Sequence, residues 1–261
     1  MSDASAAVNE PESNSDWLAQ AFRLTVFPIT PSDYETETWW QDLTGQPPEN
    51  RISQPQKGTQ IEYSQVEIGR LSLELELDRL HWRLNPGDVP AGTKPQLPVL
   101  GPLGESVGEF ASIAQGWLLH DLTPPLRRLA FGATLFLPVE DLATGYRALD
   151  QYLHSVEIDP ENMADFKFQV NRPRVLGEIV PTLSINRLSR WSVGSTQVAL
   201  IRFSSDDLVQ FGGESGYACN LELDINTSAD FEDEIGKAQS AEIYRILLDM
   251  GIEISQDGDV A

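Results

Sequence analysis

The sequence predicts an α+β protein with a mainly antiparallel sheet and about four helices. Segments with strand periodicity follow one another across short turn signals, as they do in hairpins. Helical segments stand between groups of strands and do not alternate strictly with them. Hydrophobic residues make up 41% of the 261 residues, which is enough for a substantial buried core.

The first predicted elements are a strand and a helix. Residues 22–29 have the period-two pattern of a strand, and Ser32 or Asp33 can cap a helix with an aromatic-rich face. Thr44-Gly45 predicts the end of this helix, because glycine readily adopts the left-handed conformation of a C-cap.

A hairpin is the next predicted element. Residues 59–68 and 71–84 flank Gly69-Arg70, and glycine in the first position is typical of a type II′ turn. The apolar residues change parity within the second strand, so we expect a bulge or bend near Asp78-Arg79. Residues 85–104 hold five prolines and four glycines, which predicts a linker or a long surface loop.

A helix, a strand and another helix are expected after this loop. One helical face carries Val107, Phe110, Ala114, Trp117 and Leu118. This helix must end before Pro124-Pro125. Residues 129–137 indicate a buried strand, and Pro138 is expected in the first turn of a helix that continues to Leu153.

The last third of the chain predicts more strands and a final helix. Strands are expected at 166–170, 183–193, 197–203 and 221–225. Gly194-Ser195 is expected to form a hairpin turn between the second and third of these strands. Ser228 is expected to cap a helix that ends at Gly251.

The domain organisation is predicted from a short internal similarity. The sequence TVFP at 25–28 resembles TLFLP at 134–138, and each precedes a helix with an aromatic-rich face, so two related β-α-β-β units are expected. The predicted segments are an acidic disordered tail at 1–16, a first unit at 17–84, the linker at 85–104, a second unit at 105–254 and an acidic tail at 255–261. The C-terminal segment 251–261 is expected to be frayed.

Composition excludes several classes of function. A net charge of −22 argues against direct binding to nucleic acid or to an anionic membrane, because both need a basic surface. The lone Cys219 and three scattered histidines give no disulfide and no zinc-ligand spacing, so neither a metal nor another cofactor is expected. No apolar run has the length of a membrane span and the first residues lack a signal peptide, so a cytoplasmic location is expected.

No catalytic residue is predicted. The chain contains neither a glycine-rich phosphate motif nor the hydrolase elbow. His120 and Asp121 are adjacent on a predicted helix, where their side chains point about 100° apart. The acidic cluster at 230–234 is expected in a first helical turn, where carboxylates complement the helix dipole. The sequence therefore leaves enzymatic activity undecided and favours a protein without it.

The sharpest signal is an uneven distribution of charge. Between Lys167 and Phe203 there are six basic residues and one acidic residue, which gives +5 and leaves −27 for the rest of the chain. Arginine dominates this segment, and its planar fork suits carboxylates and phosphates. The predicted anion-binding or partner-binding residues are Arg172, Arg174, Arg187 and Arg190. The alternative is that these arginines pair with the protein's own acidic surface.

Three functions are compatible with this sequence. The first is a non-enzymatic protein-interaction or assembly subunit of a cytoplasmic complex, which binds a protein partner or itself. The second is a ligand-binding protein or an enzyme of unfamiliar type, in which the arginines hold a phosphate or a carboxylate. The third is an acidic mimic of nucleic acid, which would need carboxylates arrayed on one face.

Overall fold

The computed structural model describes most of the chain. The described residues are 16–30, 34, 36–88, 97–177, 179–197, 200–203, 208–211 and 215–260. The predicted disordered tail at 1–16 lies outside these residues except for Asp16, and so do residues 89–96 of the predicted linker.

Strands form the larger part of the described fold. They are β1 (Leu18–Pro28), β2 (Asn50–Gln54), β3 (Thr59–Val66), β4 (Gly69–Leu75), β5 (Leu80–Asn85), β6 (Gly101–Pro102), β7 (Leu126–Val139), β8 (Lys167–Asn171), β9 (Arg174–Val175), β10 (Ser184–Gln197), β11 (Leu200–Phe203), β12 (Leu208–Phe211) and β13 (Ser215–Thr227). The helices of the described residues are α1 (Thr36–Thr44), α2 (Leu103–Leu119), α3 (Leu142–Asp150) and α4 (Lys237–Asp257), with a short 3₁₀ turn at Pro55–Lys57.

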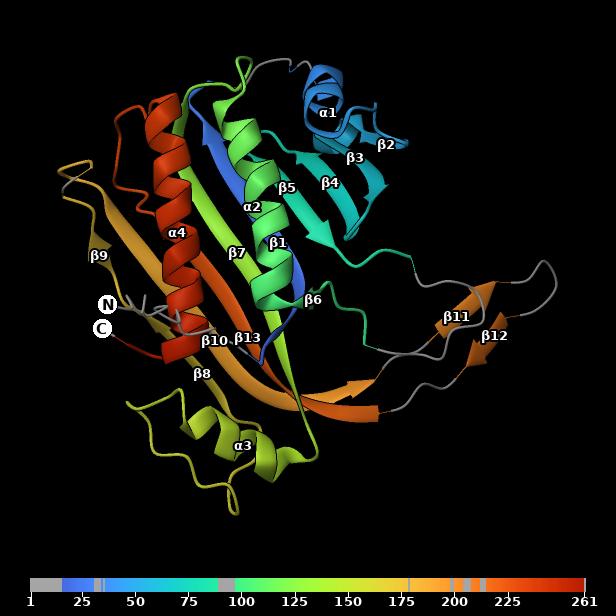
Figure 1. Cartoon of the computed structure of the whole chain (residues 1–261), viewed down its shortest axis with the longest axis vertical. Helices are drawn as coiled ribbons and strands as arrows, with labels where there is room; N and C mark the ends of the chain where they lie inside the picture. Colours follow the sequence, from blue (N-terminus) through green and yellow to red (C-terminus); the bar gives the residue numbers. More distant parts are fainter. Residues whose placement is uncertain are drawn as a thin grey trace, which may run out of the picture.

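The predicted α+β class is confirmed by the sheet. Its eleven described strands include a continuous path in the order β2-β3-β4-β5-β1-β7-β13-β10-β8, with β6 beside β1 and β9 beside β10. Every described strand pair is antiparallel. β11 and β12 form a separate two-stranded sheet, which projects from the body of the molecule (Figure 1).

The two halves of the chain share one order of elements. β1 and β7 lie side by side at the centre of the sheet, and each is followed by a helix, α1 or α3. A later strand of the same half, β5 or β13, pairs with the outer edge of that central strand, and α2 or α4 follows. Both halves therefore belong to one sheet, and a common origin of the two units remains a prediction.

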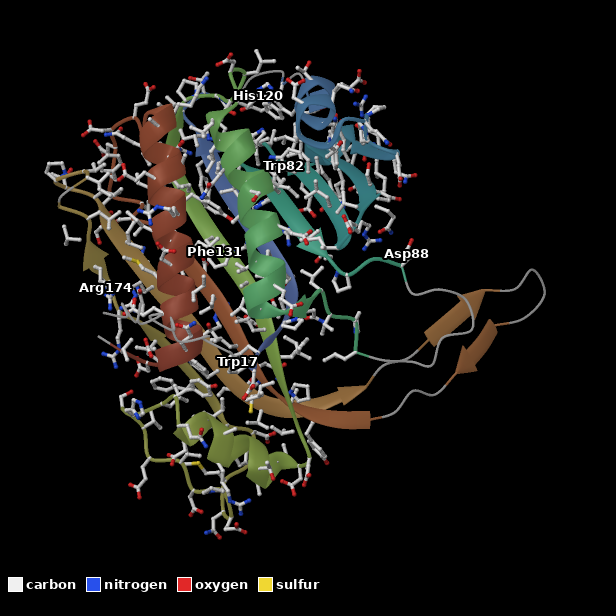
Figure 2. The ribbon with its side chains drawn as sticks, in the orientation of Figure 1. Trp17, Trp82, Asp88, His120, Phe131 and Arg174 are labelled. Carbon is white, nitrogen blue, oxygen red and sulfur yellow. The ribbon has the colours of Figure 1, made fainter. Side chains whose placement is uncertain are left out.

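The core lies between this sheet and the helices. α2 and α4 run side by side over one face of the sheet, where α2 contacts β1 and α4 contacts β7, β10 and β13 (Figure 1). The side chains of all six tryptophans are at most 1% exposed. Trp82 of β5, which Figure 2 labels, lies against Trp40 of α1 and Trp117 of α2. The ring centroids are 5.2 and 6.4 Å apart. The face of α2 that was predicted to be apolar is buried along its length.

No helix in the described part of the chain combines the length and the apolar character needed to cross a membrane.

The first hairpin turn lies two residues before its predicted position. β3 and β4 are joined by Glu67-Ile68, because Val66 pairs with Gly69. Gly69 is needed for a different reason: a Cβ atom at this position would lie 2.3 Å from the carbonyl oxygen of Asn85 on the next strand. The glycine allows a close approach of two strands and does not make the turn.

The predicted strand at 71–84 is a second hairpin. β4 ends at Leu75 and β5 begins at Leu80, with a turn in which the amide of Glu76 donates to the carbonyl of Arg79. The expected bulge near Asp78-Arg79 is therefore a turn, which explains the change of parity because each strand has its own alternation.

Gly194-Ser195 does not form the predicted hairpin turn. β10 continues through both residues to Gln197, and they pair with Ala218 and Tyr217 of β13. Glycine is tolerated here because β13 supplies a complete antiparallel ladder on one side of the strand.

Pro138 lies inside β7 and not in the first turn of a helix. β1 pairs with β7 only as far as Phe136, so β7 has β13 as its remaining neighbour at Pro138, and proline is tolerated at such an edge. α3 begins four residues later, where Asp141 caps it by accepting a hydrogen bond of 2.7 Å from the amide of Thr144.

The last helix is shifted toward the C-terminus relative to its prediction. Its N-cap is Gly236 and not Ser228, and the acidic cluster at 230–234 precedes the helix in an irregular segment. The helix also passes through Gly251, the residue predicted to end it. A Cβ atom at this position would lie 2.7 Å from Cε1 of Phe131, so glycine is required for close packing of α4 on β7.

Replacing this glycine tests the packing of α4. We expect Gly251→Ala to lower the free energy of unfolding by about 1–3 kcal/mol, because the new methyl group must displace Phe131. Gly108→Ala is the matched control in α2, where a Cβ atom would meet nothing within 4 Å. It should raise stability by about 0.5–1 kcal/mol, the helix propensity of alanine over glycine. Urea unfolding measures both changes, and equal effects of the two variants would contradict this account.

Candidate functional site

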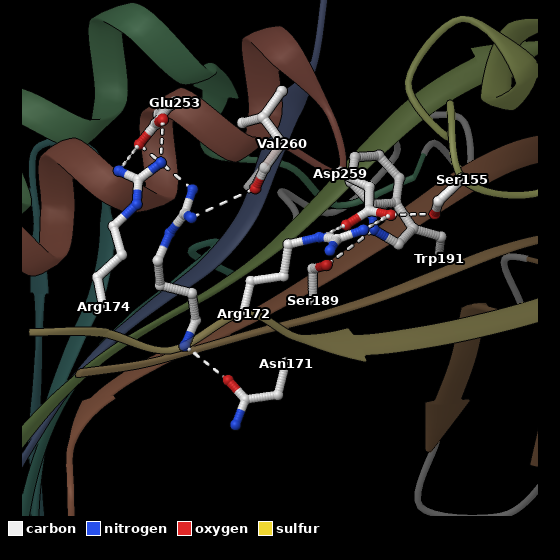
Figure 3. A network of polar contacts seen from close by, with 10 residues as sticks. Ser155, Asn171, Arg172, Arg174, Ser189, Trp191, Glu253, Asp259 and Val260 are labelled. Atoms are coloured by element: carbon white, nitrogen blue, oxygen red, sulfur yellow. Dashed lines mark hydrogen bonds and ion pairs between the residues drawn. The ribbon is translucent and has the colours of Figure 1, made fainter. Parts of the chain in front are cut away.

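The four arginines predicted as a binding site lie in two places. Arg172 follows β8, Arg174 lies on β9 and Arg187 lies on β10, and the side chains of all three reach the C-terminal end of α4 (Figure 3). Arg190 also lies on β10, but it contacts Gln169 and Glu222 on the sheet. The four residues therefore do not converge on one cavity.

Arg172, Arg174 and Arg187 all pair with carboxylates of the protein itself. Arg172 donates two hydrogen bonds to Asp259, one of 2.7 Å from Nη2 to Oδ2. Arg174 makes a bidentate pair with Glu253, with Nη1 and Nη2 at 2.8 and 2.7 Å from the carboxylate oxygens. Arg187 is 1% exposed, and it lies 3.3 Å from both Glu253 Oε2 and the carbonyl oxygen of Val260. We call these five side chains the C-terminal clamp.

The contacts of the clamp lower the pKa values of its two carboxyl groups. The hydrogen bond from Arg172 is the largest cause that holds the pKa of Asp259 below its ordinary value. The hydrogen bond from Arg174 does the same to the pKa of Glu253. Burial, with Arg174 next, lowers the pKa of Arg187. The two carboxyl groups are therefore ionised at neutral pH, where an arginine is also charged.

The clamp also corrects the expectation of a frayed C-terminal segment, as far as the described residues 251–260 are concerned. α4 continues to Asp257, and the side chain of Asp259 is only 1% exposed. Between them, Gly258 adopts φ of 79°, and a Cβ atom there would lie 1.9 Å from the carbonyl oxygen of Tyr152. The chain turns sharply at this glycine because its backbone passes against Tyr152, and the turn brings Asp259 to Arg172.

A second group of charges lies on the sheet face that points away from the core. Side chains alternate between the two faces along each strand, and residues paired across neighbouring strands point to the same face. Arg23 pairs with Arg83 and Gly132, and Gly132 pairs with Asp224, so these residues share one face of the central strands. We call this the open face, because α2 and α4 lie over the opposite face (Figure 1). Its charged strand residues, among those described, are Arg23, Arg70, Arg83, Arg128, Arg190 and Lys167, with Glu74, Glu222 and Asp224.

The open face is positive although the chain is acidic. Its strand residues, six basic and three acidic, give +3, against −22 for the whole chain. At its border, Asp88 lies 3.7 Å from Arg70, and Arg79 pairs with Glu76 and Asp78. A cavity of about 240 Å³ lies near its centre, lined among others by Arg23, Arg83, Arg190, Glu222 and Asp224. Glu74 lies 3.0 Å from Arg83, and Glu222 lies 3.2 Å from Arg190.

Arg23 differs from the other two arginines of the cavity. It forms no hydrogen bond or ion pair with any residue that the structure describes, whereas Arg83 pairs with Glu74 and Arg190 with Glu222. The Nε atoms of Arg23 and Arg83 are both buried without a hydrogen bond. The guanidinium lies over the backbone of Gly132, where an added Cβ atom would be 3.1 Å from Nη2 and 3.2 Å from Nε. Burial is the largest cause that lowers the pKa of Arg23, and Asp224 opposes it. An arginine nevertheless stays protonated at neutral pH.

Two strand residues that are neutral at pH 7, His81 and Cys219, have shifted pKa values. His81 lies beside Arg23 on the open face and shares a hydrogen bond of 2.8 Å with Thr25. Burial, followed by the charges of Arg83 and Arg23, lowers the pKa of His81 to about 3, so this imidazole adds no charge at pH 7. On the core side, burial raises the pKa of the Cys219 thiol to about 12. At neutral pH the Cys219 thiol is therefore not ionised to a nucleophilic thiolate, and the pKa of His81 is too low for a general base.

A buried carboxylate lies under α1. Glu62 of β3 is 0% exposed and accepts hydrogen bonds from four side chains, at 2.7–2.9 Å: Thr36, Trp40, Arg51 and Gln60. Its oxygens are thus engaged by α1, β2 and β3 together, which gives Glu62 a structural role.

The other candidates of the sequence do not form a site. His120 Nε2 lies 2.7 Å from Asp42 Oδ2 of α1, so it is not paired with the adjacent Asp121. In the described residues, no three His, Cys, Asp or Glu side chains are grouped as a metal site would require.

Comparisons with protein-family models, with curated proteins and with solved structures find no match to this chain.

Proposed function

We propose that the protein is a non-enzymatic binding protein, an interaction or assembly subunit, and that its open face binds an acidic segment of a partner protein. The observation that carries the proposal is the charge of this face. The strand residues of this face sum to +3 on a chain of −22, and such an excess of positive charge is complementary to negative groups.

The chemistry of the open face favours a protein partner. Arginines predominate among its cations, and arginine is enriched at protein interfaces because it combines charge, hydrogen bonds and apolar contact. The face carries few acidic side chains, which is the opposite of what a mimic of nucleic acid needs. The three clamp arginines are engaged by Glu253, Asp259 and Val260, so a phosphate site built on them gains no support.

The proposed setting is the cytoplasm. Cys219 is a free and buried thiol, and thiols persist in reducing compartments.

Charge reversal on the open face tests the proposal. The probe is a fluorescently labelled decaglutamate peptide, and fluorescence anisotropy reports its affinity. We expect Arg83→Glu/Arg190→Glu to weaken binding by at least about tenfold, because both guanidinium groups flank the central cavity. Added salt should weaken binding to the unaltered protein.

The control reverses two arginines elsewhere. Arg147→Glu/Arg245→Glu makes the same change of charge on α3 and α4, where each arginine pairs with an exposed carboxylate. This variant should bind the peptide nearly as well as the unaltered protein. A protein that does not bind decaglutamate, two double variants that lose equal affinity, or equal binding of an oligodeoxynucleotide with the same charge would each overturn the proposal.

A further inference from the structure

Resting on the proposed function, we infer that the cavity around Arg23 is a subsite that binds one carboxylate, an Asp or Glu side chain of the bound acidic segment. Arg23 is the anchoring residue of this subsite. Arg83 and Arg190 stand at its sides, and the polar side chains of Asn85 and Thr134 also line it.

The first argument is the state of the Arg23 guanidinium. A guanidinium has five N–H donors in a planar fork, and the described residues offer no acceptor to any of those of Arg23. A partly buried charge without hydrogen bonds is unfavourable for the fold, since its lost hydration is not replaced. Such a group is typical of a site whose partner arrives from outside.

The second argument is the space beside the guanidinium. Arg23 crosses β7 at Gly132, and any larger residue there would place a Cβ atom 3.1–3.2 Å from Nη2 and Nε. Glycine therefore leaves room for the guanidinium beside the strand, and Arg23 also lines the cavity. A guanidinium without protein acceptors can form a bidentate pair with the two oxygens of a carboxylate.

The third argument is the local charge, which selects the kind of anion. The charged side chains that line the cavity are Arg23, Arg83, Arg190, Glu222 and Asp224, with a sum of +1. Arg83 is further neutralised by Glu74, at 3.0 Å. One excess positive charge suits a monoanion, whereas a phosphate dianion would also meet the repulsion of Glu222 and Asp224.

The experiment compares Arg23→Gln with Arg23→Lys. Arg23→Gln should weaken decaglutamate binding by about tenfold or more, the usual scale of a lost charge-assisted pair. It should leave the melting temperature unchanged or raise it, because the group that it removes lacks partners. Arg23→Lys keeps the charge and loses the fork, so its affinity should fall between those of Arg23→Gln and the unaltered protein.

A titration with small anions identifies the ligand class. Acetate and inorganic phosphate are added at equal ionic strength while NMR follows the Nε–H signal of Arg23 and the amide signal of Gly132. Acetate should shift both signals to saturation at a lower concentration than phosphate does. Tighter binding of phosphate, or no saturable shift with either anion, would overturn the carboxylate subsite.

The outcomes also separate this inference from the proposed function. If the unaltered protein does not bind decaglutamate, the proposed function fails. If it binds, and Arg23→Gln binds equally while Arg83→Glu/Arg190→Glu does not, the open face is the interface but the subsite is refuted. A melting temperature several degrees lower in Arg23→Gln would show that Arg23 supports the fold, which also refutes the subsite.

Discussion

The double variant Arg172→Ala/Arg174→Ala is expected to lower the free energy of unfolding by about 3 kcal/mol or more. The cause is the carboxylate of Asp259, whose side chain is 1% exposed and which loses both hydrogen bonds from Arg172. Removing one partner of a buried pair leaves the other charge in an environment of low dielectric constant. Glu253 keeps Arg187 after the change, so Asp259 dominates the loss.

Unfolding in urea at several pH values tests this prediction. The pKa values of Asp259 and Glu253 are lowered in the folded state, so their contribution is complete above their ordinary pKa values of 3.8 and 4.5. It disappears as the pH falls through the folded-state values, and the difference between the variant and the unaltered protein should shrink there. Arg190→Ala is the control. Its pair with Glu222 is exposed on both sides, and its loss should change stability by less than about 1 kcal/mol. A double variant as stable as the control would contradict a structural role of the clamp.

Glu62→Ala is expected to lower the free energy of unfolding by about 3 kcal/mol or more, as measured by unfolding in urea. The change removes the acceptor of Trp40 Nε1 and of the Thr36 hydroxyl, both of which are buried with Glu62. Each unsatisfied buried donor costs about 1–3 kcal/mol. Arg51 also loses its contact of 2.8 Å with this carboxylate.

Glu37 supplies the matched control, because it is the other carboxylate partner of Arg51. Its side chain is 72% exposed, and Glu37→Ala should change the free energy of unfolding by less than about 1 kcal/mol. Similar losses in the two variants would mean that the buried hydrogen bonds of Glu62 do not stabilise α1 on the sheet.

The elements that the sequence predicted well depend on local physics. The apolar face of α2 repeats with helical periodicity over several turns, and Gly45 ends α1 with φ of 74°. Two of the misplaced element boundaries were predicted from Gly69 and Gly251, and a glycine can serve either a turn or a close contact. Gly69 and Gly251 permit close contacts with Asn85 and Phe131, which lie on other elements, and a single sequence gives a glycine in a turn and a glycine at a close contact the same letter.

The candidate site could be predicted only in part. The excess of arginine at 167–203 was visible in the sequence, but the carboxylates that three of these residues meet are 66 or more positions away. Arg23 and Arg83 occupy polar positions of two strands, which indicates an outward face. Their proximity follows from the pairing of β1 with β5, and no local pattern specifies which strands become neighbours.

The central pair of strands has a consequence for how the chain folds during synthesis. β1 finds one neighbour, β5, within its own half, but its other neighbour, β7, begins about one hundred residues later in the chain. The first half of the chain therefore emerges from the ribosome before β7 is made, with one edge of β1 unpaired. Such an edge is a template for pairing with other chains. Closing so long a loop also slows folding, because its entropic cost precedes any gain from the contacts. The interval between the synthesis of β1 and that of β7 is the period in which a nascent chain of this protein is most exposed to aggregation.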